Sequence, residues 1–166
     1  MFKRYRLWFF IVVIVLVICF VNAILSKDND TAKKFANELY SYPLPLKTVV
    51  MDKGFDYGVA YGGGPWGSGG RPTAVAYLKL STELSEQEVL NFYQNGPSLS
   101  GIEPIYGFEV YFQGKEEVIT SLNGTKSWYE GTIPKAPDQE SNEGKPIKVI
   151  VQIREEFYSP LGEFAK

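Results

Sequence analysis

The most unusual stretch of the sequence is rich in glycine and carries the spacing of a phosphate-binding loop. Residues 62–70 read GGGPWGSGG, and within them Gly62, Gly64 and Gly67 satisfy the pattern G-x-G-x-x-G. This pattern holds a pyrophosphate where a strand precedes it and a helix follows, because the helix N-terminus aims its N–H groups at the phosphates. Here Pro65 interrupts the run and a β-rich segment follows. We therefore expect a loop between two strands and no nucleotide site.

Two side chains in and beside this loop suit the binding of a ligand. Trp66 offers an aromatic surface, and Arg71 offers a cation with a forked set of donors. In a small-ligand or glycan-binding module, both side chains would contact the ligand together with the loop that contains Gly62, Gly64 and Gly67. This reading stands as the alternative to a plain connecting loop.

Groups that perform covalent catalysis are scarce. The chain contains no His, and its one cysteine, Cys19, lies in an apolar segment. These facts exclude Ser-His-Asp and Cys-His arrangements, and no Ser is followed three residues later by Lys. Adjacent acids such as Glu116 and Glu117 leave a carboxylate-dependent hydrolase as a further alternative, although such neighbours are usually only solvated. We expect a protein that is not an enzyme.

Metal and cofactor sites are not indicated either. Asp28, Asn29 and Asp30 lie side by side, but they lack the glycine and the distal glutamate of a calcium-binding loop. No Lys-Ser or Lys-Thr pair ends the glycine-rich run, as one would in a P-loop. We expect no cofactor and no metal.

An apolar segment near the N-terminus predicts where the rest of the chain lies. Residues 7–21 are all apolar, and the run extends with one polar member to Leu25. A helix over 7–25 spans about 28 Å, close to the thickness of a hydrocarbon core. Basic residues precede the segment and acids follow it, so we expect 1–6 in the cytoplasm and 27–166 outside. The pattern predicts a single-pass protein of the cell membrane with a transmembrane signal-anchor.

Two other fates of this segment compete with the anchor. A signal peptide would have the same basic start and a cleavage site with small residues, and cleavage near Ala23 would give a secreted protein. A lipoprotein would need a small residue before its lipidated cysteine, whereas Cys19 follows Ile18. The uncleaved anchor is our prediction, because the apolar run is at the long end for a signal.

Charge and cysteine content limit the partners of the outer domain. The formal net charge of the chain is −2, and Lys3, Arg4 and Arg6 precede the apolar run. Removing these three of the 17 Lys and Arg residues leaves 14 basic against 19 acidic residues, a net charge of −5. Nucleic acids and anionic lipids attract basic surfaces, so neither is an expected partner of the domain. With no cysteine outside the apolar segment, the domain cannot form an internal disulfide.

Hydrophobic periodicity predicts the elements of this domain. Residues 30–40 show the stripe of a short amphipathic helix, which Pro43 ends. A second helix begins after Ser85, which forms a capping box with Glu88, and ends at the C-cap glycine Gly96. The β-rich stretches are 46–51, 54–61, 73–80, 105–113, 117–121, 125–133 and 146–157.

The last of these stretches indicates a sheet with one buried face. Val149, Val151 and Ile153 alternate there with polar residues such as Gln152. The order of helix, strands, helix and strands predicts an α+β fold. We expect a mainly antiparallel sheet with one or two helices packed on one face, preceded by an N-terminal transmembrane helix.

Four short stretches carry a further indication about location. They are 42–45 (YPLP), 48–50 (TVV), 56–58 (DYG) and 80–93, which holds the cap of the second helix and a Phe-Tyr pair. Together they resemble a group of uncharacterised, membrane-anchored or secreted proteins of Gram-positive bacteria. No activity is established for that group, so the resemblance implies a location and a fold and implies no mechanism.

The sequence thus predicts a non-enzymatic, extracytoplasmic domain associated with the cell envelope. Its expected partners are the lipid bilayer, through residues 7–25, and an envelope protein or polymer. The glycine-rich loop with Trp66 and Arg71 offers the ligand-binding alternative, and the paired carboxylates offer the hydrolase.

Overall fold

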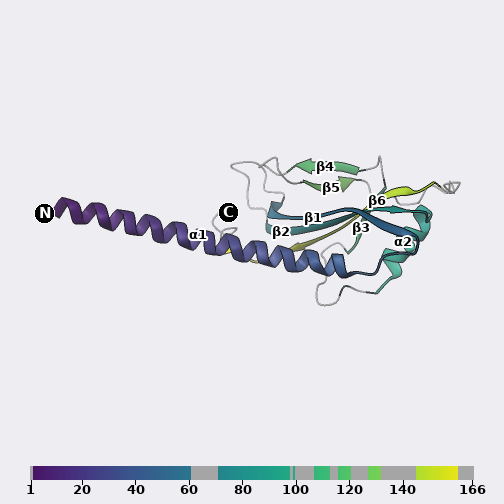
Figure 1. The fold of residues 1–166 in the computed structure, drawn as a ribbon, viewed down its shortest axis with the longest axis horizontal. Helices are drawn as coiled ribbons and strands as arrows, with labels where there is room; N and C mark the ends of the chain where they lie inside the picture. The colour runs from purple at the N-terminus through teal and green to yellow at the C-terminus, as the bar shows by residue number, and fades with distance from the viewer. Residues whose placement is uncertain are drawn as a thin grey trace.

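The computed structural model describes residues 2–60, 71–97, 99, 107–112, 116–120, 127–131 and 145–160. One long N-terminal helix extends from a domain that is built on an antiparallel sheet (Figure 1). Helices pack on one face of this sheet and an apolar helix precedes it, which confirms the predicted α+β fold.

The N-terminal helix α1 is a single element, Phe2–Ser41. The sequence predicts two helices, 7–25 and 30–40, and the structure joins them into one. No Gly or Pro occurs before Pro43, so nothing in the sequence breaks the backbone hydrogen bonding between the two segments. The apolar segment and the first helical segment of the domain are therefore one continuous helix.

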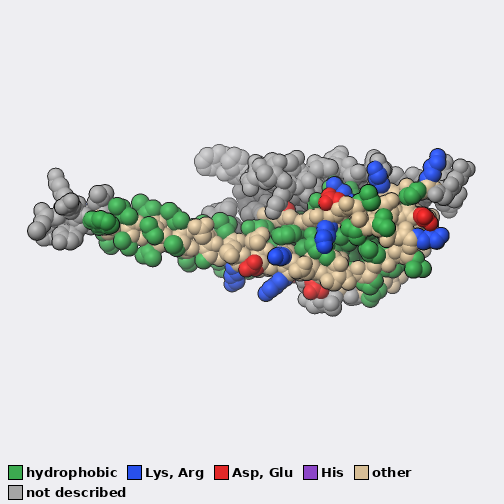
Figure 2. Space-filling view, in the orientation of Figure 1, with side chains coloured by type: hydrophobic (Ala, Val, Ile, Leu, Met, Phe, Trp, Pro, Cys, Tyr) green, Lys and Arg blue, Asp and Glu red, His purple; other side chains and the backbone are tan. Residues whose placement is uncertain are grey.

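The part of α1 from Trp8 to Phe20 is apolar on all sides and exposed. Large apolar side chains from Trp8 to Phe20 project from the helix outside the domain (Figure 2). By length and composition this helix could cross a membrane. The structure is therefore compatible with the predicted membrane-spanning helix.

The second half of α1 lies against the sheet. Within residues 30–40, its buried residues are Ala32, Phe35, Ala36 and Leu39, whose spacing of three or four residues gives one helix face. The helix ends at Ser41, where the N–H of Tyr42 bonds the carbonyl of Leu39 at 3.1 Å. The stripe predicted for 30–40 is the face that covers the sheet.

Four antiparallel strands form the sheet in the order β1-β2-β6-β3. Their bounds are Thr48–Ala60 for β1, Arg71–Thr82 for β2, Glu109–Phe112 for β3 and Ile147–Glu156 for β6. The segments predicted at 46–51 and 54–61 are one strand, β1, with a shift of register between Val50 and Asp52. The bulge accounts for the break in the sequence pattern.

The short helix α2, Glu86–Asn95, begins and ends where the sequence predicts. The Ser85 hydroxyl accepts from the Glu88 N–H at 3.3 Å, and the Glu88 carboxylate accepts from the Ser85 N–H at 2.8 Å. Gly96 is the C-cap residue, as predicted, and its backbone is extended with φ −73°. Glycine is needed for space, because a Cβ there would collide with the Tyr42 hydroxyl and the Phe92 carbonyl.

The two faces of the sheet are covered by different elements. On one face, α1 and α2 enclose the main core together with Leu78, Val110 and Val151. A two-stranded antiparallel sheet, β4 (Glu116–Thr120) and β5 (Ser127–Gly131), lies over the opposite face (Figure 1). The expectation that only one face is buried was therefore wrong, because Gln152 points toward β5 and is fully buried.

Candidate binding groove at the sheet edge

The strand β1 forms one edge of the main sheet. Among the strands that the structure describes, β1 pairs only with β2, so its outer side has no strand partner there. A sheet edge presents N–H and C=O groups that another chain can pair with. The bulge after Val50 interrupts this edge near its start.

A groove lies between the start of β1 and the end of α1. Its volume is about 480 Å³, and it is lined by Tyr40, Leu44, Val50, Met51, Asp52, Lys53 and Leu78. Leu78 is buried and belongs to the main core, whereas the β1 residues of the lining are exposed. The groove is thus an open cleft whose apolar base continues the core of the domain.

Five exposed apolar side chains fall within residues 44–51, and we call them the apolar edge patch. They are Leu44, Leu46, Val49, Val50 and Met51. Three of them, Leu44, Val50 and Met51, line the groove. Leu46 is 84% exposed, Met51 64% and Val49 59%, which leaves most of each side chain in water. Contiguous exposed apolar surface beside a cleft is typical of a site that contacts another molecule.

Polar groups flank the apolar edge patch. The ammonium group of Lys53 lies 4.6 Å from the centre of the Tyr40 ring, as a cation over an aromatic face. Burial raises the pKa of Tyr40 to about 12, with the charges of Tyr77 and Asp52 adding to the shift. The Tyr40 hydroxyl therefore keeps its proton at neutral pH and can donate a hydrogen bond.

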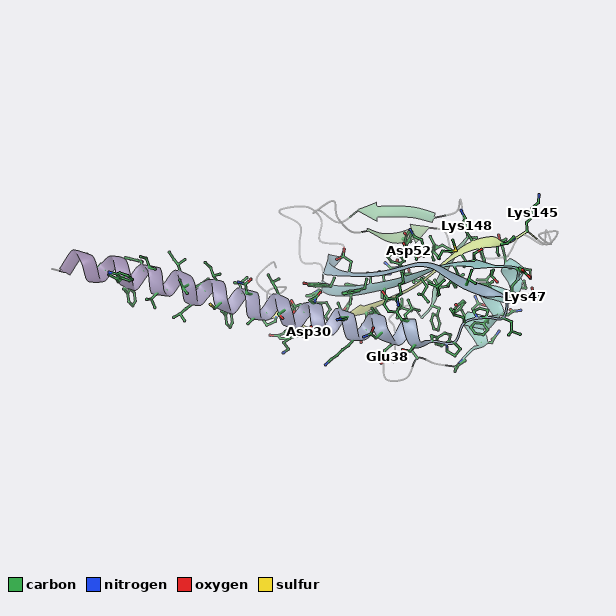
Figure 3. All side chains as sticks on the ribbon, in the orientation of Figure 1. Asp30, Glu38, Lys47, Asp52, Lys145 and Lys148 are labelled. Carbon is green, nitrogen blue, oxygen red and sulfur yellow. The ribbon has the colours of Figure 1, made fainter. Side chains whose placement is uncertain are left out.

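A second group of polar side chains lies on the face toward β5. The Lys79 ammonium is 3.3 Å from the Asp52 carboxylate and stands over the rings of Tyr77 and Tyr129 at 5.7 and 5.6 Å. A hydrogen bond with Tyr129 is the main reason that the pKa of Lys79 is raised. Asp52 lines the groove and binds Lys79, so it joins the groove to this cluster (Figure 3).

Two buried carboxylates elsewhere in the domain hold the fold together. Glu109 is 1% exposed, and its two carboxylate oxygens accept from Arg154 at 2.6 Å, from Tyr111 at 2.7 Å and from Gln152 at 2.9 Å. Asp28 is also buried and accepts from the Ser159 hydroxyl at 2.5 Å. Both carboxylates are therefore engaged in structural hydrogen bonds.

The residues predicted for ligand binding lie mostly outside the described part of the chain. Residues 61–70 are outside the described part, and they include Gly62, Gly64, Trp66 and Gly67. Arg71 is the first residue of β2, and only its backbone is described. The strands on either side pair with each other, with Ala60 opposite Arg71. The strand β2 begins directly after residue 70, which confirms the prediction that a β-strand follows the glycine-rich stretch.

The other predicted chemistry stays a prediction. Glu116 and Glu117 begin β4, and their side chains lie outside the described set. Within the described residues, no three His, Cys, Asp or Glu side chains come together as a metal site would require. The groove residues Tyr40 and Asp52 were not singled out in the sequence, where the only signal was the apolar run Val49-Val50-Met51 at the start of a strand.

Comparison of the chain with protein families, with curated proteins and with solved structures finds no match.

Proposed function

We propose that this chain is a non-enzymatic, membrane-anchored domain that binds an extended segment of an envelope protein along the outer edge of β1. The first half of α1 anchors it in the membrane, and the domain lies on the outer side. The location follows from the basic residues before the apolar run and the acids after it. The resemblance to membrane-anchored or secreted proteins of Gram-positive bacteria supports the same location.

The single observation that carries the proposal is the groove beside an edge strand without a described strand partner. An extended segment laid along that edge would pair with the backbone of β1 and place alternate side chains in the groove. The apolar edge patch supplies the hydrophobic part of such a contact. Burying one side chain the size of Leu46 or Met51 contributes about 1.5 to 3 kcal/mol.

Lipid is a poor occupant for this groove because α1 holds the groove at a distance from the membrane. Tyr40 follows Leu25 by fifteen helical residues, which is a rise of about 22 Å. Lys47, next to the apolar edge patch, lies at the end of the domain farthest from the exposed half of α1 (Figure 3). A protein segment fits this place better than a lipid surface does.

The proposal is tested by crosslinking on intact cells. A photoreactive amino acid replaces Met51 in the full-length protein, and another replaces the exposed residue Gln87 on α2 as the control. We expect a product from position 51 that maps by mass spectrometry to one segment of one envelope protein. The same product from position 87 would contradict the proposal, as would no product from position 51.

A charge introduced in the apolar edge patch gives a second test. Leu46→Asp should abolish the product formed at position 51, because a carboxylate cannot be buried there without a partner. Gln87→Asp is the matched control and should leave the product unchanged. If the product survives Leu46→Asp, the apolar edge patch is not the contact surface.

A further inference from the structure

The domain follows the apolar part of α1 without a linker. The apolar run ends at Leu25, yet Ile24 is already buried against the domain and Asp28 is buried one turn later. The helix is continuous through these positions. The domain therefore cannot move away from the membrane surface as it could on a flexible tether.

Two other parts of the domain are tied to α1 at the same level. The Tyr57 hydroxyl of β1 donates to the Leu25 carbonyl at 3.4 Å. The Ser159 hydroxyl, just beyond β6, donates to Asp28 at 2.5 Å. The Phe157 N–H bonds the Pro72 carbonyl of β2 at 2.9 Å, which ties the same segment to the sheet.

These contacts place the end of the domain within the lipid headgroups when α1 spans the bilayer. A headgroup layer is about 5 to 7 Å thick on each side of the hydrocarbon, or roughly four residues of helix. If the hydrocarbon ends at Leu25, the layer reaches about Asn29. Asp28 and the segment bonded to it lie inside this interval.

We propose that this end of the domain, formed by Lys27, Tyr57 and residues 157–159, rests in the headgroup layer with Tyr158 as its interfacial anchor. Tyr158 is 71% exposed, and it adjoins the residue that bonds Asp28. Tyrosine favours this layer because its ring is apolar and its hydroxyl is polar. The contact needs no anionic lipid, in keeping with the acidic charge of the domain.

The contact would fix the orientation of the domain as well as its height. A helix alone lets the domain rotate and tilt with the bilayer, whereas a second point of contact at Tyr158 restricts both motions. The groove at the other end of α1 would then be held about 22 Å above the hydrocarbon. This inference rests on the membrane anchoring in the proposed function.

The test measures the depth of a nitroxide label in the full chain. Cys19→Ser removes the native cysteine, and Tyr158→Cys or, as the control, Leu46→Cys supplies the labelling position. Both variants are reconstituted in phosphatidylcholine vesicles, and collision of the label with oxygen and with a water-soluble nickel chelate is measured. We expect several-fold fewer nickel collisions at position 158 than at position 46, with a depth near the lipid phosphates.

Two contrary results can be told apart. Equal nickel collisions at both positions, in protein that resists alkaline extraction from the vesicles, would overturn this inference and leave the anchoring intact. Protein that alkali extracts would contradict the anchoring itself. Because both labelled side chains are exposed, neither substitution disturbs the core, and a third label at Lys27 should give the same depth as Tyr158.

Discussion

Gln152 binds both backbone groups of Tyr129 through its side chain. The Gln152 Oε1 atom accepts from the Tyr129 N–H at 2.8 Å, and its Nε2 atom donates to the Tyr129 carbonyl at 2.9 Å. The same Nε2 atom donates to Glu109 at 2.9 Å. The Gln152 side chain of β6 thus makes the two backbone hydrogen bonds that a neighbouring strand would make to Tyr129. These bonds hold β5 on the sheet.

Replacing Gln152 should therefore destabilise the domain strongly. Gln152→Leu has a similar volume but leaves two backbone groups of Tyr129 buried without a partner, each at a cost of about 1 to 3 kcal/mol. We expect the free energy of unfolding in detergent micelles to fall by about 2 to 4 kcal/mol. Gln87→Leu, at an exposed position of α2, is the control and should change it little; an equal loss in both would refute the role of Gln152.

The Glu109 and Arg154 pair should show the asymmetry of a buried ion pair. Arg154→Met leaves the Glu109 carboxylate buried without its cation and should cost about 3 to 5 kcal/mol. Adding Glu109→Gln to this variant removes the uncompensated charge and should recover part of the loss. Chemical denaturation of both variants measures the difference, and a double variant no more stable than Arg154→Met would contradict the prediction.

Gly54 is required by the ring of Tyr77. A Cβ at position 54 would lie 2.6 Å from the Tyr77 hydroxyl oxygen and 2.8 Å from its ring carbons. Gly54→Ala should therefore lower stability by about 1 to 3 kcal/mol, as expected for overpacking. In Tyr77→Ala the same glycine substitution should cost much less, so a double-mutant cycle that gives additive losses would disprove the contact.

Tyr93 should make the domain sensitive to alkali. Its hydroxyl is buried, accepts or donates no hydrogen bond among the described residues, and has a pKa that burial raises above the ordinary 10.0. The folded state then holds this proton more tightly than the unfolded state does. The stabilisation that follows from the raised pKa of Tyr93 is fully present below pH 10, the ordinary pKa of tyrosine. It is lost as the pH rises from there through the pKa of the folded state.

The variant Tyr93→Phe keeps the ring contacts with Tyr42 and Phe108 and removes the titrating group. We expect the free energy of unfolding at pH 7 to be unchanged or higher by about 1 kcal/mol, because no buried hydrogen bond is lost. Between pH 10 and 12 the variant should lose less stability than the parent protein. Thermal melts at pH 7 and pH 11 measure both effects, and a clear loss at pH 7 would show that the hydroxyl has a partner.

Features set by neighbouring residues could be predicted from the sequence. The apolar run from 7 to 25 needs only its own composition to indicate a spanning helix. The cap of α2 at Ser85 and Glu88 needs only a spacing of three residues. The alternation of Val149, Val151 and Ile153 shows which side of β6 faces the core, since successive strand residues point to opposite faces.

Features that join distant residues were decided by the tertiary structure alone. Gln152 follows the polar alternation of β6, and only the placement of β5 above it makes it a buried docking residue. Tyr40 and Asp52 belong to a helix and a strand that the packing of α1 on the sheet brings to one groove. The burial of Asp28 also depends on packing, because its hydrogen-bond partner Ser159 lies 131 residues later in the chain.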